Sequence, residues 1–354
     1  MALSFLNRSA KKRDQIVAID LGGRTTKAVY IQRRGAALAL ASYSLHDAPI
    51  YEKSISPDLL GEHLKTVVGS LNARTKLVTL AVGVADSVLR QAEMPAVPLG
   101  DMRMMLKLNS KAYLQQDLPG HVFDCHFMMP KAGKPEEEKK GAQAKLRVMV
   151  GGAKQQLVND LQTGTRNAGL VPDQIVPSLI GPYNAFEMAQ PEIFGKEVVA
   201  LVEIGFKNSS ITVLMEGELS LSRVVGIGGD KMTAGLAESM GITYAEAESI
   251  KVGMATEVQS NLEPLLIPLG RELRASIDFF EHQQDKTVGQ VFFSGAAARS
   301  EFVLQALQNE LMVPCKPWSP VSFMQLSLPP QQLAEVEQVA PQLAVAVGAA
   351  VCGL

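Results

Sequence analysis

Two segments about 180 residues apart contain the residues with the clearest chemical potential, and both follow one pattern. Each has an apolar strand, an acidic residue, a turn that contains glycine, and a second strand. The first segment is 16–29, with Asp20 as its acidic residue, and the second is 199–213, with Glu203. Either segment alone is also typical of an ordinary β-hairpin. The repetition is more informative, because internal duplication is a property of a whole fold.

The turns of these hairpins have the composition of an anion-binding site. A tight turn without bulky side chains lets backbone N–H groups point at phosphate oxygens, and glycine supplies the positive φ and the close approach. Hydroxyl groups would add hydrogen bonds and basic side chains would balance charge. The acidic residues would hold Mg²⁺ through its waters, since Mg²⁺ seldom sheds them all. Two facing hairpins would clamp a polyphosphate, and the candidates are Asp20, Gly22, Gly23, Arg24, Thr25, Thr26 and Lys27, with Glu203, Gly205, Lys207, Asn208 and Ser209.

Two further segments with small residues would extend such a site. The first leads from a strand into a helix, and we expect Asp230 to be its N-cap. The second follows the strand 290–293, where small residues would let a flat ring lie against the backbone, although a plain strand-to-helix turn explains the same residues. The candidates in these segments are Gly228, Gly229 and Asp230, and Gly295, Ala296 and Ala297.

A charged pair on a predicted helix is a weaker candidate. Thr243 and Glu246 form a capping box that opens this helix. Glu248 and Lys251 then lie on one face, because residues three apart are neighbours on a helix. Without other context a surface ion pair is the simpler interpretation.

The hydrophobic pattern predicts a mixed α/β sheet protein, since strands first form a meander and then alternate with helices. We expect a Pro-containing linker around Pro172 and Pro177 between the two halves. A charged stretch at 131–141 is typical of a hairpin tip. The expected strands are 37–43, 77–84, 122–129, 145–150, 197–204, 209–215, 219–225 and 290–293, and the expected helices are 57–71, 102–114, 154–168, 183–189 and 265–284.

Composition excludes several classes of protein. At 354 residues the chain suggests two or three domains. Its net charge of −2 disfavours nucleic-acid binding. Three widely spaced cysteines and no HExxH pattern fit a reducing compartment without structural zinc. No signal-peptide core is visible and the longest apolar tract, near 343–354, is too short to span a bilayer, so we expect a soluble cytoplasmic protein.

The order of these segments resembles the actin-like ATPase superfamily, and more narrowly the PilM family of type IV pilus assembly. The resemblance extends from Ile16 to the small-residue final helix at 341–348, through the segments 20–27, 227–233, 246–251 and 293–296. It implies an α/β, ribonuclease H-like, duplicated two-lobe fold with a small inserted subdomain. The implied division is a basic tail at 1–14, a first lobe at 15–94 and 172–195, an insert at 95–171, a second lobe at 196–339, and a connecting helix at 340–354.

The resemblance also implies ligands and partners. ATP and Mg²⁺ would bind between the lobes, with Asp20 and Glu203 on the hydrated metal, Glu248 and Lys251 at the ribose and base, and Gly295 to Ala297 beside the adenine. The insert and the first lobe would capture the cytoplasmic tail of an inner-membrane pilus protein of the PilN type. The protein would then be an adaptor, peripheral to the cytoplasmic membrane at its inner face. Pilus motor ATPases and self-association are further candidate interactions.

Three departures from the family pattern affect these expectations. Glu203 replaces an Asp, and its extra methylene alters metal geometry when Mg²⁺ demands a near-octahedral shell. Ala296 and Ala297 replace glycines, and Arg24 is bulkier than the residues usual in the first turn. No residue is identified that would activate the attacking water, on which phosphoryl transfer depends. We therefore expect ATP binding with weak or no ATPase activity.

Three alternatives remain. One is another actin-like scaffold, such as an FtsA-like division protein or the cytoplasmic component of a type II secretion system; an FtsA-like chain would be expected to end in an amphipathic membrane helix, whereas this one ends in a small apolar helix. A sugar or acetate kinase would need an acidic general base in a polar pocket, which the sequence does not reveal. A degenerate scaffold without nucleotide binding is the third.

Overall fold

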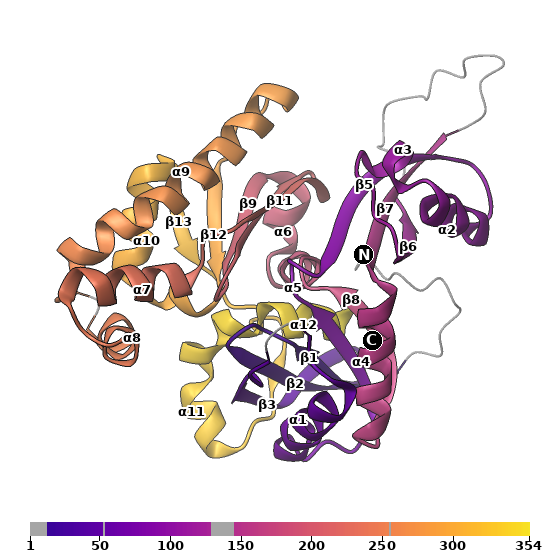
Figure 1. Cartoon of the computed structure of the whole chain (residues 1–354), viewed down its shortest axis with the longest axis horizontal. Helices are drawn as coiled ribbons and strands as arrows, with labels where there is room; N and C mark the ends of the chain where they lie inside the picture. Colours follow the sequence, from indigo (N-terminus) through magenta and orange to yellow (C-terminus); the bar gives the residue numbers. More distant parts are fainter. Residues whose placement is uncertain (1–12, 52–53, 129–144, 255) are drawn as a thin grey trace.

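The computed structural model describes residues 13–51, 54–128, 145–254 and 256–354. The expected hairpin tip at 131–141 and all but the last two residues of the expected basic tail lie outside these ranges. The described strands form three sheets, which Figure 1 shows in three parts of the molecule.

The first sheet has six strands in the order β14-β3-β2-β1-β4-β8. Its central strand β1 pairs antiparallel with β2 and parallel with β4. The strands are β1 (Gln15–Asp20), β2 (Thr25–Arg34), β3 (Ala37–Asp47), β4 (Leu77–Val82), β8 (Val171–Pro177) and β14 (Gln325–Leu326).

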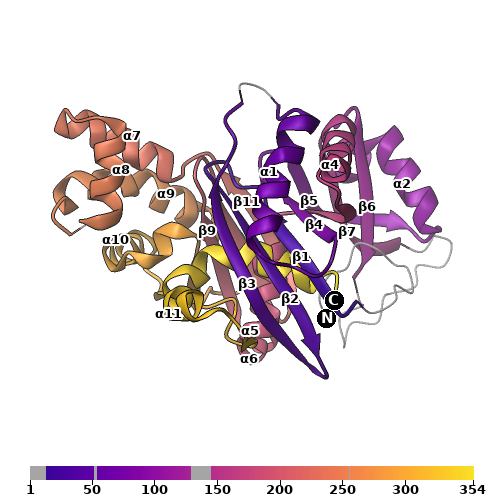
Figure 2. The same ribbon diagram turned by 90° about the horizontal axis from the view of Figure 1, so that it is seen from below.

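The alternation of side chains along β1 explains why both faces of this sheet are covered. Val17 and Ile19 point to the face covered by α1 (Pro57–Ser70) and α4 (Gln155–Asn167), whereas Ile16 and Ala18 pack with the opposite core. Helices α1 and α4 lie side by side in Figure 2. On the other face, α12 (Ala344–Val351) packs on α5 (Ile180–Ala189) and β1, and it lies at the centre of Figure 1.

Helices α5 and α12 cross at two glycines. A Cβ at Gly348 would lie 1.7 Å from the carbonyl oxygen of Gly181, so any larger residue would force the two backbones apart. All eight residues of α12 are buried, in accordance with its run of small apolar residues. This helix therefore belongs to the interior of the protein.

The second sheet repeats the arrangement of the first, in the order β11-β10-β9-β12-β13. Its central strand β9 also pairs antiparallel with the next strand and parallel with a later one. Its elements are β9 (Val198–Ile204), β10 (Ser209–Met215), β11 (Glu218–Val225), β12 (Gln290–Ser294) and β13 (Cys315–Pro317), with α7 (Gly229–Met240), α8 (Tyr244–Gly253), α9 (Gln259–Gln284) and α10 (Glu301–Leu311). We call the first sheet with its helices the first lobe, and this sheet with α7 to α10 the second lobe.

The third sheet, β5-β7-β6, is a small antiparallel unit. It packs against two short helices around the core residues Met102, Leu106 and Phe123. Its elements are β5 (Ser87–Pro95), β6 (His121–Phe127), β7 (Lys145–Lys154), α2 (Leu99–Leu108) and α3 (Ser110–Leu114). The shorter elements of the chain are α6 (Pro191–Lys196), η1 (Ala296–Arg299), α11 (Pro330–Val339) and η2 (Ala340–Leu343).

Three local expectations were wrong. The segment around Pro172 and Pro177 is strand β8 and not a linker; among the described strands β8 pairs with β4 alone, and an edge strand tolerates proline. The helix expected at 102–114 is interrupted at Asn109, whose φ of −149° is not helical and whose side chain caps α3. Asp230 is not an N-cap, because that position belongs to Gly228.

Two strands also lie outside the sheets that the expected division assigned to them. Most of β5 falls in the range 15–94 but pairs with β7 in the third sheet, and β14 falls in the range 196–339 but pairs with β3 in the first. Helix α1 covers nearly the expected residues, whereas the partners of strands are set by distant parts of the chain.

Candidate functional site

A cleft of about 1380 Å³ lies between the two lobes, where the hairpins β1–β2 and β9–β10 face each other. Most of the candidate residues line it, although they come from segments far apart in the sequence. The candidates along its walls are Asp20, Gly22, Gly23, Arg24, Thr25, Thr26, Lys27, Glu203, Gly205, Lys207, Asn208, Gly229, Glu248, Lys251, Gly295, Ala296 and Ala297.

Glycine is required in both hairpin turns for a steric reason. A Cβ at Gly22 would lie 2.4 Å from the carbonyl oxygen of Thr25, and one at Gly205 would lie 2.6 Å from that of Asn208. The turns are therefore too tight for any side chain at these positions. Their backbone amides can approach a bound group closely, as an anion site needs.

Three charged groups meet at the base of the cleft. The Lys27 ammonium donates to Asp20 Oδ2 at 2.9 Å. Burial, reinforced by the Asp20 carboxylate, raises the pKa of Glu203 to about 7, although Lys27 and a hydrogen bond from Ser294 act in the opposite direction. Burial lowers the pKa of Lys27, but the carboxylates of Asp20 and Glu203 outweigh it and the net pKa is raised. These two carboxylates therefore favour an additional cation between them.

The pair of Glu248 and Lys251 is part of a partly buried network and not an exposed surface ion pair. The Lys251 ammonium donates to Glu248 Oε2 at 2.7 Å, to Thr233 Oγ1 at 2.6 Å and to the carbonyl oxygen of Gly229 at 3.1 Å. Thr233 also donates to Glu248. Burial raises the pKa of Glu248, but the hydrogen bonds from Lys251 and Thr233 outweigh it and the net pKa is lowered. The helix begins with the predicted capping box.

The segment after β12 forms a turn against the second hairpin. Gly295 has a φ of +89°, and a Cβ there would lie 2.5 Å from the carbonyl oxygen of Ile204. The short helix η1 starts at Ala296. The turn therefore needs glycine at one position and presents small residues to the cleft after it.

Three candidates do not line the cleft. Ser209 is buried and donates to the carbonyl oxygen of Ile227 at 2.7 Å. A Cβ at Gly228 would lie 2.3 Å from the carbonyl oxygen of Phe206, so this glycine lets α7 start against the hairpin. Asp230 accepts from the Tyr244 hydroxyl at 2.7 Å.

The sequence did not single out three further residues at the cleft. Thr233 bridges Glu248 and Lys251 as described above. His63 lies 2.8 Å from the hydroxyl of Thr26, between Nε2 and Oγ1, and Phe206 packs beneath Arg24. Thr233 lies one helical turn after Gly229, and this spacing indicates a position beside the cleft. Nothing in the local sequence distinguishes His63.

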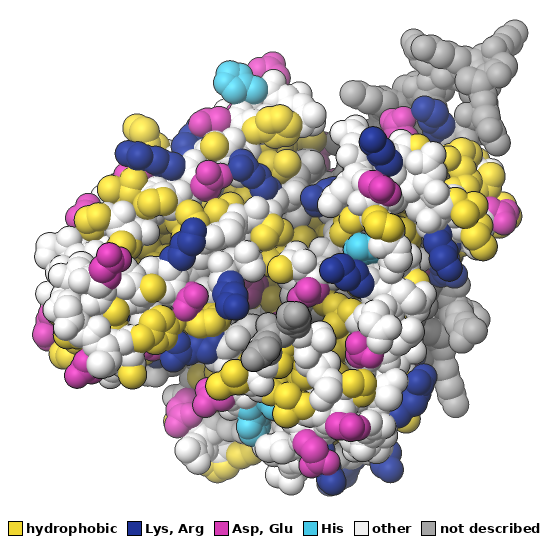
Figure 3. All heavy atoms as spheres, in the orientation of Figure 1, with side chains coloured by type: hydrophobic (Ala, Val, Ile, Leu, Met, Phe, Trp, Pro, Cys, Tyr) yellow, Lys and Arg dark blue, Asp and Glu magenta, His cyan; other side chains and the backbone are white. Residues whose placement is uncertain are grey.

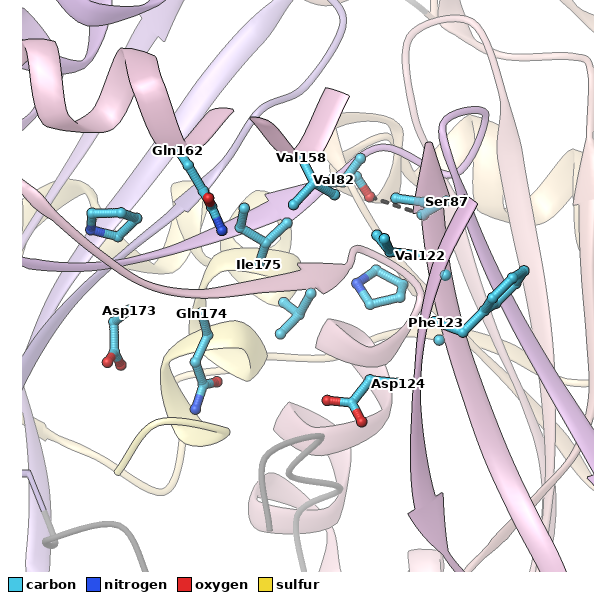
Figure 4. A pocket seen from close by; sticks show the side chains of 16 residues that line it. Val82, Ser87, Val122, Phe123, Asp124, Val158, Gln162, Asp173, Gln174 and Ile175 are labelled. Atoms are coloured by element: carbon cyan, nitrogen blue, oxygen red, sulfur yellow. Dashed lines mark hydrogen bonds between the residues drawn. The ribbon is translucent and has the colours of Figure 1, made fainter. Parts of the chain in front are cut away.

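A second, smaller cavity of about 250 Å³ lies between the third sheet and the edge of the first. Apolar side chains from β6, α4 and β8 form its walls, among them Val122, Val158 and Ile175, and two carboxylates lie along one side (Figure 4). We call this cavity the insert groove. Its polar side includes Asp173, whose Oδ1 accepts from Arg13 and whose Oδ2 has no hydrogen-bond partner within the described part of the chain.

Two features are absent from the described residues. No helix there combines the length and the apolar character that crossing a membrane requires. No cluster of three or more His, Cys, Asp or Glu side chains within those ranges is placed to hold a metal ion. On the face shown in Figure 3, basic and acidic side chains are interspersed.

Comparison with known proteins identifies the family. The model of the family described as type IV pilus assembly protein PilM matches residues 18–353. This chain belongs to the PilM family. The resemblance seen in the sequence is thereby confirmed.

Solved structures agree with this family and with the fold. The chain is similar to a PilM–PilN type IV pilus biogenesis complex, with a TM-score of 0.82 and 21% identity over 97% of this chain and 99% of that one. It is also similar to the ethanolamine utilization protein EutJ from Carboxydothermus hydrogenoformans (TM-score 0.57, 14% identity, 97% and 91% covered). MreB5 of Spiroplasma citri bound to ADP matches with a TM-score of 0.51 and 10% identity, over 96% of each chain. The expected actin-like fold is confirmed.

Proposed function

We propose that this PilM-family protein is a nucleotide-binding adaptor of type IV pilus assembly, which binds Mg-ATP between its lobes and the tail of a membrane protein in the insert groove. The convergence of the two hairpins, the Glu248–Lys251 network and the Gly295 turn on one cleft is the observation that carries the nucleotide part. In a protein of this family and fold, this combination supports a nucleotide better than any other ligand.

Each wall of the cleft would have its own task. The amides of the two hairpin turns would bind phosphates, assisted by Lys27 and Lys207. Glu248 and Lys251 would contact ribose and base, and the turn after Gly295 would flank the adenine. Mg²⁺, when bound, would neutralise phosphate charge. The residues fit a hydrated ion, because Asp20 and Glu203 are oxygen ligands of the kind it prefers and their mutual repulsion favours a cation.

The adaptor part is supported by the family and by the insert groove. A structure similar to this chain is described as a PilM–PilN complex, and the groove offers apolar walls to an extended segment. A tail of the PilN type, bound there, would place the protein at the inner face of the cytoplasmic membrane. Motor ATPases and self-association are further proposed contacts.

Calorimetric titration with Mg-ATP tests the nucleotide site. We expect saturable binding to the wild type and a loss of about tenfold or more in Asp20→Asn, since charge-assisted contacts contribute about 1.5–3 kcal/mol. Asp230→Asn is the matched control, because Asp230 undergoes the same chemical change outside the cleft. Equal affinities of the wild type and Asp20→Asn would remove Asp20 from the site.

Titration with synthetic cytoplasmic tails tests the adaptor part. The tails are those of the PilN-type protein of a type IV pilus and of its type II secretion counterpart. We expect the pilus tail to bind and Val158→Lys, which puts a charge into the insert groove, to abolish binding. Leu333→Lys on the exposed face of α11 is the control. If neither tail binds, the assignment of this partner fails.

A further inference from the structure

Arg24 joins the two lobes across the cleft. It lies in the first hairpin turn, and its Nη1 is 3.7 Å from Glu248 Oε2 in the second lobe. Its guanidinium also lies over the ring of Phe206, 5.5 Å from the centroid. The neighbouring Gly23 faces the same ring, since a Cβ there would lie 3.8 Å from a carbon of Phe206. The tips of the two hairpins therefore contact each other at this point.

The two ends of this contact differ in rigidity. Glu248 is fixed within its lobe by Lys251 and Thr233, whereas the side chain of Arg24 is 41% exposed. The separation of 3.7 Å is longer than a hydrogen bond, and a half-exposed ion pair of this kind is weak. The ion pair with Glu248 is therefore the part of this contact that a stronger anion can replace.

A nucleotide phosphate is such an anion. Guanidinium groups bind phosphate with two parallel hydrogen bonds, which are shorter and stronger than the present contact. Arg24 shares its turn with the amides that would receive phosphates. Adenosine brings no anion and would leave Arg24 without a new partner. Phosphate-bearing and phosphate-free ligands therefore differ in their effect on this contact.

We propose that Arg24 is a latch between the lobes, which exchanges Glu248 for a nucleotide phosphate and thereby couples phosphate binding to the separation of the lobes. The contact of Arg24 with Glu248 and Phe206 holds the two lobes together, and the exchange releases it. This inference deepens the proposed function and rests on it for the identity of the ligand. The contact between Arg24 and Glu248 itself can be tested in nucleotide-free protein.

Interlobe distances in the nucleotide-free full chain test the latch. Spin labels on cysteines introduced at two exposed positions, Lys65→Cys on α1 and Gln305→Cys on α10, report the distance between the lobes by pulsed electron paramagnetic resonance. We expect Arg24→Gln and Glu248→Gln to broaden the distance distribution and shift it to longer values. Arg223→Gln is the matched control, because Arg223 pairs with Glu272 at 2.8 Å within one lobe. A distribution in Arg24→Gln identical to that of the parent would overturn the latch.

Titrations with ADP and with adenosine test the exchange. We expect ADP, but not adenosine, to shift the wild-type distances, and Arg24→Gln to lose about tenfold in ADP affinity with adenosine affinity unchanged or higher. Equal losses for both ligands would overturn the exchange. If the wild type binds neither ligand, the proposed nucleotide site and the exchange fail together, whereas the distances in the empty protein decide the latch on their own.

Discussion

The charge of Glu203 should make the nucleotide-free protein less stable as the pH rises. Burial beside Asp20 raises the pKa of this carboxyl from 4.5 to about 7. The folded state then holds a proton that the unfolded state loses, so the unfolding free energy falls as the pH passes from 4.5 to 7. A shift of this size corresponds to about 3 kcal/mol, at about 1.4 kcal/mol per pH unit. Most of this change lies between pH 5 and pH 8.

Glu203→Gln removes this titration and keeps the shape of the side chain. The unfolding free energy of the variant minus that of the wild type should be about 2–3 kcal/mol larger at pH 8 than at pH 5. The assay is urea denaturation at the two pH values with EDTA and without nucleotide. Glu248→Gln is the control, because the pKa of Glu248 is lowered and its titration lies below this window. A difference between Glu203→Gln and the wild type that is the same at both pH values would refute the reasoning.

Three other substitutions or reactions probe the remaining structure. Gly348→Ala should lower the free energy of urea unfolding by about 3 kcal/mol or more, because its Cβ would overlap the backbone at Gly181. Gly195→Ala is the control and should be neutral, because a Cβ there meets nothing within 4 Å. Equal stabilities of the two variants would contradict the close crossing of α5 and α12. Thr233→Val should cost about 1–3 kcal/mol by leaving Lys251 and Glu248 short of a partner, and an unchanged unfolding midpoint would argue against the network. The three cysteines should react with iodoacetamide at pH 8 about a thousandfold more slowly than a free thiol, since burial raises each pKa to about 12; fast alkylation before unfolding would contradict their burial.

Local signals sufficed to find the cleft. The two hairpins could be predicted because an acidic residue and a glycine turn after an apolar strand are adjacent in sequence, and because the pattern occurs twice. The steric need for Gly22 and Gly205 is likewise local, since each would collide with a carbonyl oxygen three residues further along. The capping box of α8 follows from residues within one helical turn. These features depend on contacts between near neighbours in the chain.

Long-range contacts explain what the sequence did not reveal. Strand β8 looked like a linker because its prolines cannot donate to a sheet, and only its edge position next to β4 makes them acceptable. His63 on α1 reaches Thr26 on strand β2, and no spacing along the chain indicates that contact. The contact of Glu248 with Thr233 joins two successive helices, and the spacing within either helix alone does not indicate it.

Parallel titration of two variants tests the central claim most directly, namely that one chain binds nucleotide and tail at separate sites. Asp20→Asn and Val158→Lys are each titrated with Mg-ATP and with the PilN-type tail. We predict that Asp20→Asn loses Mg-ATP binding and that Val158→Lys loses tail binding while retaining Mg-ATP. The opposite pattern, in which Val158→Lys loses Mg-ATP and Asp20→Asn retains it, would contradict the account.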